Sequence, residues 1–427
     1  MIAALHRLGA RHGRRRWAAP ALAVVAASLA GVLAWQALTG AGGVAPSRVR
    51  DGTLAGVRPS VASAGAAAVQ HYEYVFPDEH MYVYDIDHGH RLVAQRTFPG
   101  LKGIRGVAAD PGTHALYISH GGDGGGNGDG SLLKYDLVAE RVVWDRSYPS
   151  GIDSMAVSRD GSRIFMPTGE LSSSGLWSVI DAGSGDVVGQ IRAGAGPHNT
   201  IVSPGGAHVY LGGRDHDYLE VADTRNDRVV KRIGPLRSGV RPFTINGRET
   251  LAYTTATGFL GFQVSSIVSG RVLYTVTFGK RFSWDPRSFG SSAPSHGISL
   301  SPDERRLWVM DAPNSYVHVY DVSRVPRRPP RKIADVKLSH PMSGDESPCS
   351  YDCGRDGWIQ HSRSGRYVYV GDSGDVISTS TFRRVAYLEP LHNSRKHLEI
   401  DWSNGVPVAT TTRSGLGYVT GRAKRHG

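Results

Sequence analysis

The sequence is poor in cysteine, with only Cys349 and Cys353 among its 427 residues. They lie four residues apart, in Ser-Pro-Cys-Ser-Tyr-Asp-Cys-Gly. In an oxidising compartment such a pair is expected to form a local disulfide. The alternative is a C-x3-C metal or haem site, but this segment lacks both the usual ligand spacing and an attached histidine.

Several other signals are missing. After the N-terminal segment, no stretch has a sustained helical period, and no nucleophile elbow, Walker loop or H-E-x-x-H motif is present. The glycine-rich segment 121–130 contains a G-x-G-x-x-G pattern without the strand-to-helix context of a dinucleotide site. Its Asp123, Asn127 and Asp129 do not have EF-hand spacing. We interpret the segment as a hairpin loop.

The first 44 residues differ from the rest. Five arginines between residues 7 and 16 precede an uncharged run from Trp17 to Val44. Because about 20 apolar residues span a bilayer, and a basic flank stays in the cytoplasm, this segment predicts export. It is either an uncleaved signal anchor or a signal peptide, since small residues suited to cleavage lie between Thr39 and Ala45. The protein is therefore expected outside the cytoplasm, membrane-anchored or secreted.

The remaining chain divides into three parts. Residues 45–71, rich in Ala, Gly, Ser and Pro, predict a flexible tether; residues 72–421 predict a folded domain, and residues 422–427 a basic tail. The formal net charge of +11 falls to +6 outside the five N-terminal arginines, with 44 basic against 38 acidic residues. We expect no nucleic-acid partner, because export separates the protein from nucleic acid and no such motif is present.

The folded part repeats a pattern of an apolar run, a polar anchor, a Gly- or Pro-containing turn and a second apolar run. The seven anchors, 40 to 61 residues apart, are Asp110, Ser158, Ser203, Asn246, Ser301, Ser362 and Trp402. This spacing is typical of four-stranded propeller blades. The apolar runs are short and rich in Val, Ile and Tyr, as strands are. The sequence thus predicts an all-β, seven-bladed β-propeller.

The two ends of the repeat each form part of a blade. Leu398–Ile400 and Val408–Thr410 are expected to be the first two strands of the last blade, and Tyr82–Asp85 and Leu92–Ala94 its third and fourth strands. Completing one blade from both termini would close the ring and hide the sheet edges.

The Ser301-Pro302-Asp303 turn, the strand after it and the Val-Tyr-Asp ending resemble the YVTN-type seven-bladed β-propellers. The resemblance covers roughly residues 72–421. It implies an exported or surface-layer-associated protein and leaves the activity open. The literal Tyr-Val-Thr-Asn motif is missing, and Tyr418-Val419-Thr420-Gly421 lies outside the expected strand.

One column of the repeat is unexpectedly polar. Five residues before the anchors stand Arg105, Asp153, His198, Arg241, His296, Gly357 and His397. The second strands are predicted to end near the same channel mouth. Their end positions include His120, Asp311 and Asp372, and Arg413 directly follows the end position of the last blade, Thr412. We expect these side chains to form a ligand site, although a merely solvated rim would have the same composition.

Two kinds of chemistry fit this column. His296, Asp311, Asp372 and His397 could hold a divalent metal with one position left for water. Arg105, Arg241 and Arg413 would favour an anionic ligand through paired hydrogen bonds. The leading hypothesis is a cell-envelope module that binds a small or anionic ligand, or an envelope protein. The alternatives are a metal-assisted lyase or hydrolase with His296 or His397 as the catalytic base, and a purely structural surface protein.

A second column contains a further prediction. Just before five of the anchors stand apolar residues, but the last two blades have His361 and Asp401 there. Because an unpaired buried polar group is costly, we expect His361 and Asp401 to hydrogen-bond to each other as a structural pair.

Overall fold

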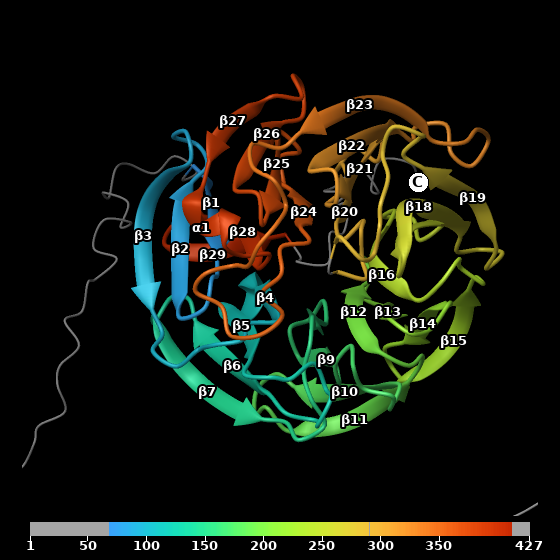
Figure 1. The fold of residues 1–427 in the computed structure, drawn as a ribbon. Helices are drawn as coiled ribbons and strands as arrows, with labels where there is room; N and C mark the ends of the chain where they lie inside the picture. The colour runs from blue at the N-terminus through green and yellow to red at the C-terminus, as the bar shows by residue number, and fades with distance from the viewer. Residues whose placement is uncertain (1–67, 290, 412–427) are drawn as a thin grey trace, which may run out of the picture. The chain divides into compact units, whose positions relative to one another are not determined.

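The structure is a computed structural model that describes residues 68–289 and 291–411. It is a ring of seven antiparallel sheets, as the repeat predicts (Figure 1). Six sheets have four strands and one has five. Two short helical segments are present among the described residues, η1 (Pro111–Thr113) and α1 (Glu389–His392). Neither is long and apolar enough to cross a bilayer.

In blades 1 to 6 the chain forms the innermost strand first and the outermost strand last. Blade 1 has β4 (Gly106–Asp110), β5 (Ala115–His120), β6 (Ser131–Asp136) and β7 (Arg141–Ser147). Blade 2 has β8 (Ala156–Val157), β9 (Arg163–Pro167), β10 (Leu176–Asp181) and β11 (Val187–Arg192). Blade 3 has β12 (Pro197–Val202), β13 (His208–Gly213), β14 (Leu219–Asp223) and β15 (Arg228–Ile233).

Blade 4 has β16 (Val240–Ile245), β17 (Leu251–Ala256), β18 (Phe259–Ser266) and β19 (Val272–Thr277). Blade 5 has β20 (Ile298–Leu300), β21 (Arg306–Asp311), β22 (Tyr316–Asp321) and β23 (Arg331–Lys337). Blade 6 has β24 (Trp358–His361), β25 (Tyr367–Gly371), β26 (Asp375–Ser378) and β27 (Arg384–Tyr387).

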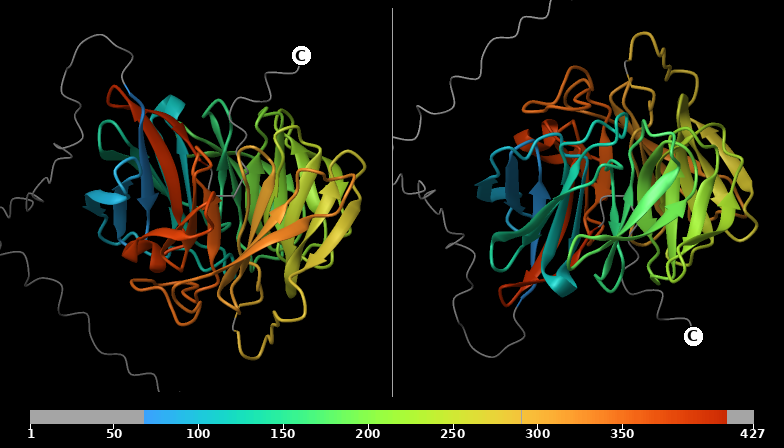
Figure 2. Two further views of the ribbon diagram at one scale, coloured as in Figure 1. Left: turned by 90° about the horizontal axis from the view of Figure 1, so that it is seen from above. Right: turned by 90° about the horizontal axis from the view of Figure 1, so that it is seen from below.

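Blade 7 is composite, in the order β29-β28-β1-β2-β3. The C-terminal part supplies β28 (His397–Ser403) and β29 (Val406–Thr410), and the N-terminal part supplies β1 (Gln70–Val75), β2 (His80–Asp85) and β3 (Arg91–Thr97). Ring closure from both termini is confirmed, and Figure 2 shows the blue N-terminal strands beside the red C-terminal ones.

The division of blade 7 differs from the prediction. The second strand is β1, which pairs with β28 over six residues, so three strands come from the N-terminal side. The strand β29 lies on the opposite edge of β28, as an extra innermost strand. The tight turn at Asn404 and Gly405 predicts that β28 and β29 pair, but not which edge of β28 the pairing uses. The predicted tether also ends too late, because β1 begins at Gln70.

The core lies between the blades. Cluster members alternate along each strand, so that each sheet packs apolar side chains against the next sheet. The cluster that joins blade 7 to blade 1 contains Tyr72 and Tyr74 of β1, Leu398 and Ile400 of β28, and Val107 of β4. All five side chains are buried. The closing joint therefore has a true hydrophobic core and not only strand pairing.

The predicted pair between His361 and Asp401 is wrong. His361 Nδ1 hydrogen-bonds Ser299 Oγ at 2.8 Å, in blade 5. Asp401 instead accepts from His71 Nδ1 at 2.8 Å and from the Arg363 guanidinium. Equivalent positions of successive blades point in the same direction around the ring, so they cannot face each other. Each finds its partner in the preceding blade or in the paired strand.

The environment of His361 leads to a prediction on acid stability. Burial, with a contribution from Arg306, lowers the pKa of His361 to about 3. The unfolded chain therefore binds a proton near pH 6.5 that the folded protein excludes, so this stabilisation exists above pH 6.5 and is lost as the pH falls toward 3. Urea unfolding should show that the wild type loses about 2 kcal/mol more than His361→Leu between pH 7 and pH 5. Equal losses in both proteins would contradict this origin.

Candidate functional site

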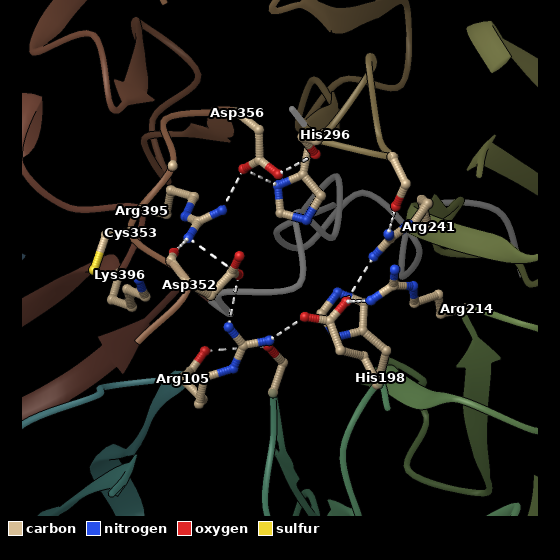
Figure 3. A pocket seen from close by; sticks show the side chains of 15 residues that line it. Arg105, His198, Arg214, Arg241, His296, Asp352, Cys353, Asp356, Arg395 and Lys396 are labelled. Carbon is tan, nitrogen blue, oxygen red and sulfur yellow. Dashed lines mark hydrogen bonds and ion pairs between the residues drawn. The ribbon is translucent and has the colours of Figure 1, made fainter. Parts of the chain in front are cut away.

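A pocket of about 350 Å³ lies where the inner strands begin, and every blade contributes to it or to the layer directly behind it (Figure 3). Five cationic side chains line it, from blades 1, 3, 4 and 7: Arg105, Arg214, Arg241, Arg395 and Lys396. Two imidazoles, His198 and His296, and three carboxylates, Glu170, Asp352 and Asp356, complete the charged lining. Counting the histidines as neutral, the lining has two more positive than negative groups.

The polar column converges on this pocket. Arg105, His198, Arg241 and His296 all line it. Asp153 lies directly behind the surface, fully buried, and contacts both His198 Nδ1 at 3.0 Å and Arg105 Nη2 at 3.4 Å. The position of these five predicted residues at one structural level follows from their common place, just before or at the start of an inner strand.

The other predicted residues lie elsewhere. His397 is fully buried and its Nδ1 contacts Glu73 Oε1 of β1 at 2.7 Å. His120 contacts Asp145 of the outermost strand of blade 1 at 3.0 Å. Asp311 is buried and bonds His318 Nε2 at 3.0 Å. Arg413 lies outside the described residues.

Asp372 is close to the pocket but does not line it. Its Oδ2 accepts hydrogen bonds from the backbone N–H groups of Asp356 and Gly357, at 3.1 and 3.0 Å, and lies 3.6 Å from Arg395 Nε. Burial and the neighbouring Glu346 raise the pKa of Asp372 well above its usual range. Asp372 is thus a buried support beneath Arg395.

The structure therefore does not bring together the four residues predicted to hold a metal, His296, Asp311, Asp372 and His397. Only His296 faces the pocket. The other three side chains form hydrogen bonds or ion pairs with the groups named above, away from the pocket surface. For Asp311 and Asp372 the sequence argument failed because a second strand ends one strand further from the channel axis than the first. His397 begins the inner strand β28, but its imidazole pairs with Glu73 of β1 and not with the pocket.

Sequence reasoning missed six of the ten titratable residues that line the pocket. Arg395 and Lys396 immediately precede His397, and Asp356 immediately precedes Gly357, so a shift of one or two residues in the repeat alignment would have found them. Glu170, Arg214 and Asp352 come from loops between strands, where the repeat has no fixed length. No sequence signal identifies those three.

Glu170 forms the centre of an arginine cluster. Its Oε1 contacts Arg105 Nη2 at 2.8 Å, and its Oε2 contacts Arg241 Nη1 at 2.9 Å and Arg214 Nη1 at 3.1 Å. Burial alone would raise the pKa of Glu170, but Arg105, His198 and Arg241 hold it far below the usual range. Glu170 thus occupies, as a carboxylate, the position where three guanidinium groups converge.

A second cluster surrounds Arg395, which is almost fully buried. Its guanidinium contacts Glu346 at 3.2 Å and Asp352 at 3.3 Å, and also pairs closely with Asp356. Burial opposes ionisation of Asp356, yet Arg395 and His296 lower its pKa to about 2. The pocket therefore has two ion clusters, centred on Glu170 and on Arg395, and Asp352 bridges them through Arg105 at 2.8 Å.

The two histidines have a defined orientation. His296 Nδ1 lies 2.9 Å from the Gly357 carbonyl oxygen and 3.0 Å from Asp356 Oδ1, so Nδ1 must carry the proton. Burial, together with Arg395 and Arg241, lowers the pKa of His296. In a neutral imidazole whose proton is on Nδ1, Nε2 is the acceptor nitrogen. His198 Nδ1 similarly contacts Asp153, and within the described residues its buried Nε2 has no hydrogen-bond partner. The two rings stack 6.2 Å apart.

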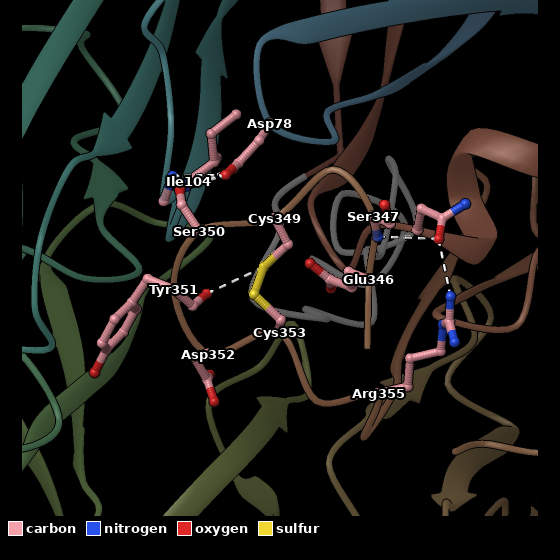
Figure 4. The surroundings of a disulfide bond; sticks show 12 residues. Asp78, Ile104, Glu346, Ser347, Cys349, Ser350, Tyr351, Asp352, Cys353 and Arg355 are labelled. Atoms are coloured by element: carbon pink, nitrogen blue, oxygen red, sulfur yellow. Dashed lines mark hydrogen bonds between the residues drawn. A yellow bond between two sulfur atoms is a disulfide. The ribbon is translucent and has the colours of Figure 1, made fainter. Parts of the chain in front are cut away.

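The predicted disulfide between Cys349 and Cys353 is confirmed (Figure 4). The short loop that it closes reaches blades 7 and 1. Ser350 Oγ donates to Asp78 of blade 7, and the Arg105 guanidinium of blade 1 lies 5.1 Å from the Tyr351 ring centre. Asp352 accepts from Arg105 and Arg395. The disulfide thus fixes one wall of the pocket.

Comparison with known proteins assigns no family to the chain. No family model matches the chain, and no curated protein does. Among solved structures, Kuenenia stuttgartiensis hydrazine synthase is similar, with 17% sequence identity and a TM-score of 0.47. The match covers 73% of this chain and 87% of that chain. At this level the similarity carries no argument, and the assignment as a seven-bladed β-propeller rests on the strand order of the structure itself.

Proposed function

We propose that the protein binds a small anionic ligand, with one or more carboxylate or phosphate groups, in the pocket at the channel mouth. The observation that supports this most is the convergence of Arg105, Arg241 and Arg214 on a single carboxylate, Glu170. Polar residues that merely face solvent at a channel mouth do not require three guanidinium groups around one buried carboxylate. A ligand oxyanion next to Glu170 would use the same planar donors.

The pocket is suited to a small molecule rather than to a protein surface. A volume of about 350 Å³ falls at the lower end of the range for ligand sites. Arg395 and Lys396 on one wall, and Asp352 with Asp356 beside them, would allow a ligand with groups of both signs. An envelope protein could still reach the rim, but it would not fill a charged cavity of this kind.

Export is part of the same proposal. The basic flank and uncharged run of residues 1–44, which lie outside the described residues, support an exported and membrane-anchored or secreted protein. A disulfide beside the pocket fits an oxidising compartment. The YVTN-type resemblance is consistent with this location and remains part of the proposal.

A second candidate is an acid–base enzyme acting on the bound anion. It is favoured by the carboxylate-supported imidazoles, since His198 and His296 both direct their protons toward a carboxylate or carbonyl and keep Nε2 free. Such an arrangement suits a general base. Nitrogen-15 NMR of His296 tests this directly, because a proton on Nε2 at neutral pH would exclude the role.

Binding can be tested with inorganic phosphate and malonate on the full-length protein, using sodium chloride at equal ionic strength as the control. We expect calorimetric binding of one of the two anions, weakened about 10- to 100-fold in Arg241→Met, because one charged hydrogen-bonding group is lost. Glu170 keeps two arginine partners in that variant, so folding should be retained.

The matched control is Arg232→Met, which removes an exposed guanidinium that pairs with Glu220 at 3.1 Å outside the pocket. Its affinity for the anion should equal that of the wild type. Equal affinity in all three proteins, or an effect of chloride as large as that of the test anions, would contradict the assignment of the site.

A further inference from the structure

Three side chains of metal-ligating types meet where β1 pairs with β28. His71 of β1 stands opposite Asp401 of β28, and Glu399 lies two residues earlier, on the same face of β28. The His71 Nδ1 atom lies 2.8 Å from Asp401 Oδ1 and 3.6 Å from Glu399 Oε1. One ligand atom from each residue lies within 4.8 Å of the other two.

Arg363 of blade 6 holds both carboxylates by hydrogen bonds. Asp401 directs Oδ1 to His71, while its Oδ2 accepts from the Arg363 guanidinium. Glu399 Oε2 accepts from the backbone N–H of Arg363 at 2.7 Å, which leaves Oε1 toward His71. Each carboxylate therefore has one oxygen anchored by blade 6 and the other directed at the imidazole. Outer partners of this kind orient the ligands of protein metal sites.

The spacing suits a small divalent ion. Bonds of 2.0 to 2.2 Å in a tetrahedron place neighbouring ligand atoms roughly 3.3 Å apart. The distances of 2.8 and 3.6 Å from His71 Nδ1 to the two oxygens lie on either side of that value. The carboxylates are buried, whereas 33% of the His71 side chain is exposed. An ion could therefore enter from the His71 side and keep a water molecule there.

We propose that His71, Glu399 and Asp401 bind a divalent transition metal, Zn²⁺ in the first place, and that this ion links β1 to β28. We call this three-residue site the clasp. One imidazole nitrogen and two carboxylate oxygens are a ligand set for Zn²⁺, whereas Mg²⁺ prefers oxygen ligands alone. Two buried carboxylates against the single positive charge of Arg363 leave one negative charge, which attracts a cation to this place. The site joins segments more than 320 residues apart in sequence and is independent of the ligand pocket.

The test uses full-length protein stripped with EDTA and then given Zn²⁺, Mn²⁺ or Mg²⁺. We expect one zinc per chain by atomic emission and a rise in melting temperature of roughly 5 °C when zinc is 100-fold above its Kd. Mg²⁺ should have no effect. The variant His71→Gln keeps a hydrogen-bond donor for Asp401 but should lose both the zinc and the temperature shift.

The control is His208→Gln, because His208 also bonds a carboxylate, Glu249, at 2.8 Å and is similarly exposed, at 39% of its side chain. This variant should bind zinc as the wild type does. Zinc retained by His71→Gln would overturn the proposal by placing the ion elsewhere. Absence of stoichiometric zinc in the wild type would overturn it in favour of a simple imidazolium–carboxylate ion pair.

Should His71→Gln fail to fold, His198→Gln decides between the clasp and the pocket. Zinc bound at the clasp must survive that change, and zinc lost on removing His198 would assign the ion to the pocket instead. Loss of anion affinity in Arg241→Met has no bearing on either result. The proposals for the pocket and for the clasp can therefore fail separately.

Discussion

Deleting residues 68–98 is expected to abolish cooperative unfolding of the propeller. The deletion removes β1, β2 and β3, and it leaves β28 without its outward neighbour. It also removes Tyr72 and Tyr74 from the core shared with Leu398 and Val107. Burial of a large apolar side chain contributes about 1.5–3 kcal/mol, so the loss of all eight buried apolar residues of this segment matches or exceeds the stability of an ordinary domain, about 5–15 kcal/mol. These residues are Tyr72, Tyr74, Val75, Phe76, Met81, Val83, Tyr84 and Ile86. Circular dichroism during heating and in urea measures the loss.

The matched change is truncation after Ser403, which removes β29. Because β29 lies on the inner edge of β28, the truncated chain still has a four-stranded blade 7. Its unfolding should remain a single sharp transition, although at a lower temperature. A sharp transition after the N-terminal deletion would contradict ring closure by the N-terminal strands. Loss of the sharp transition after the C-terminal truncation would restore the two-plus-two blade expected from the sequence.

Replacing Arg395 with Met is expected to destabilise the protein by about 3–5 kcal/mol, the usual cost of leaving buried charges unpaired. Its guanidinium contacts Glu346, Asp352 and Asp356, and the side chain is only 2% exposed. Methionine replaces much of the volume but none of the charge. Urea unfolding at pH 7 gives the difference in the free energy of unfolding.

The loss should shrink as the pH falls, because the carboxylates released from Arg395 regain ordinary pKa values and become protonated more easily than in the wild type. Arg281→Met is the control, since Arg281 is 66% exposed and pairs with Asp335 at 3.3 Å. We expect it to cost under about 1 kcal/mol. If Arg395→Met costs no more than Arg281→Met, the buried cluster does not stabilise the fold.

The sequence predicts the propeller well because its signal is periodic. Anchors such as Ser158 and Ser301 directly follow an inner strand, and the turn after each anchor predicts where the next strand begins. The same regularity places Arg105, His198 and Arg241 at one level. Where the interval before the anchor changes, the prediction fails. Arg395 stands seven residues before Trp402 instead of five, so the column names His397 in its place.

Other parts of the site could not be predicted for physical reasons. Glu170 and Asp352 lie in loops whose length and course follow from contacts across the ring, which no local pattern records. His361 and Asp401 occupy equivalent positions of the sequence repeat. The repeat does not reveal that equivalent side chains all point in the same direction around the ring. Rotational symmetry, and not polarity, determines their partners.

The composite blade also determines when the fold can be completed during synthesis. The strand β1 is made near the start of the chain, yet its inner neighbour β28 ends only at Ser403. Until then, the inner edge of β1 has open backbone hydrogen-bonding groups that could pair with another chain. His71 and Glu73 stand on that strand and make it less apolar than an ordinary core strand. A growing chain therefore remains an open arc until β28 pairs with β1 and closes the ring.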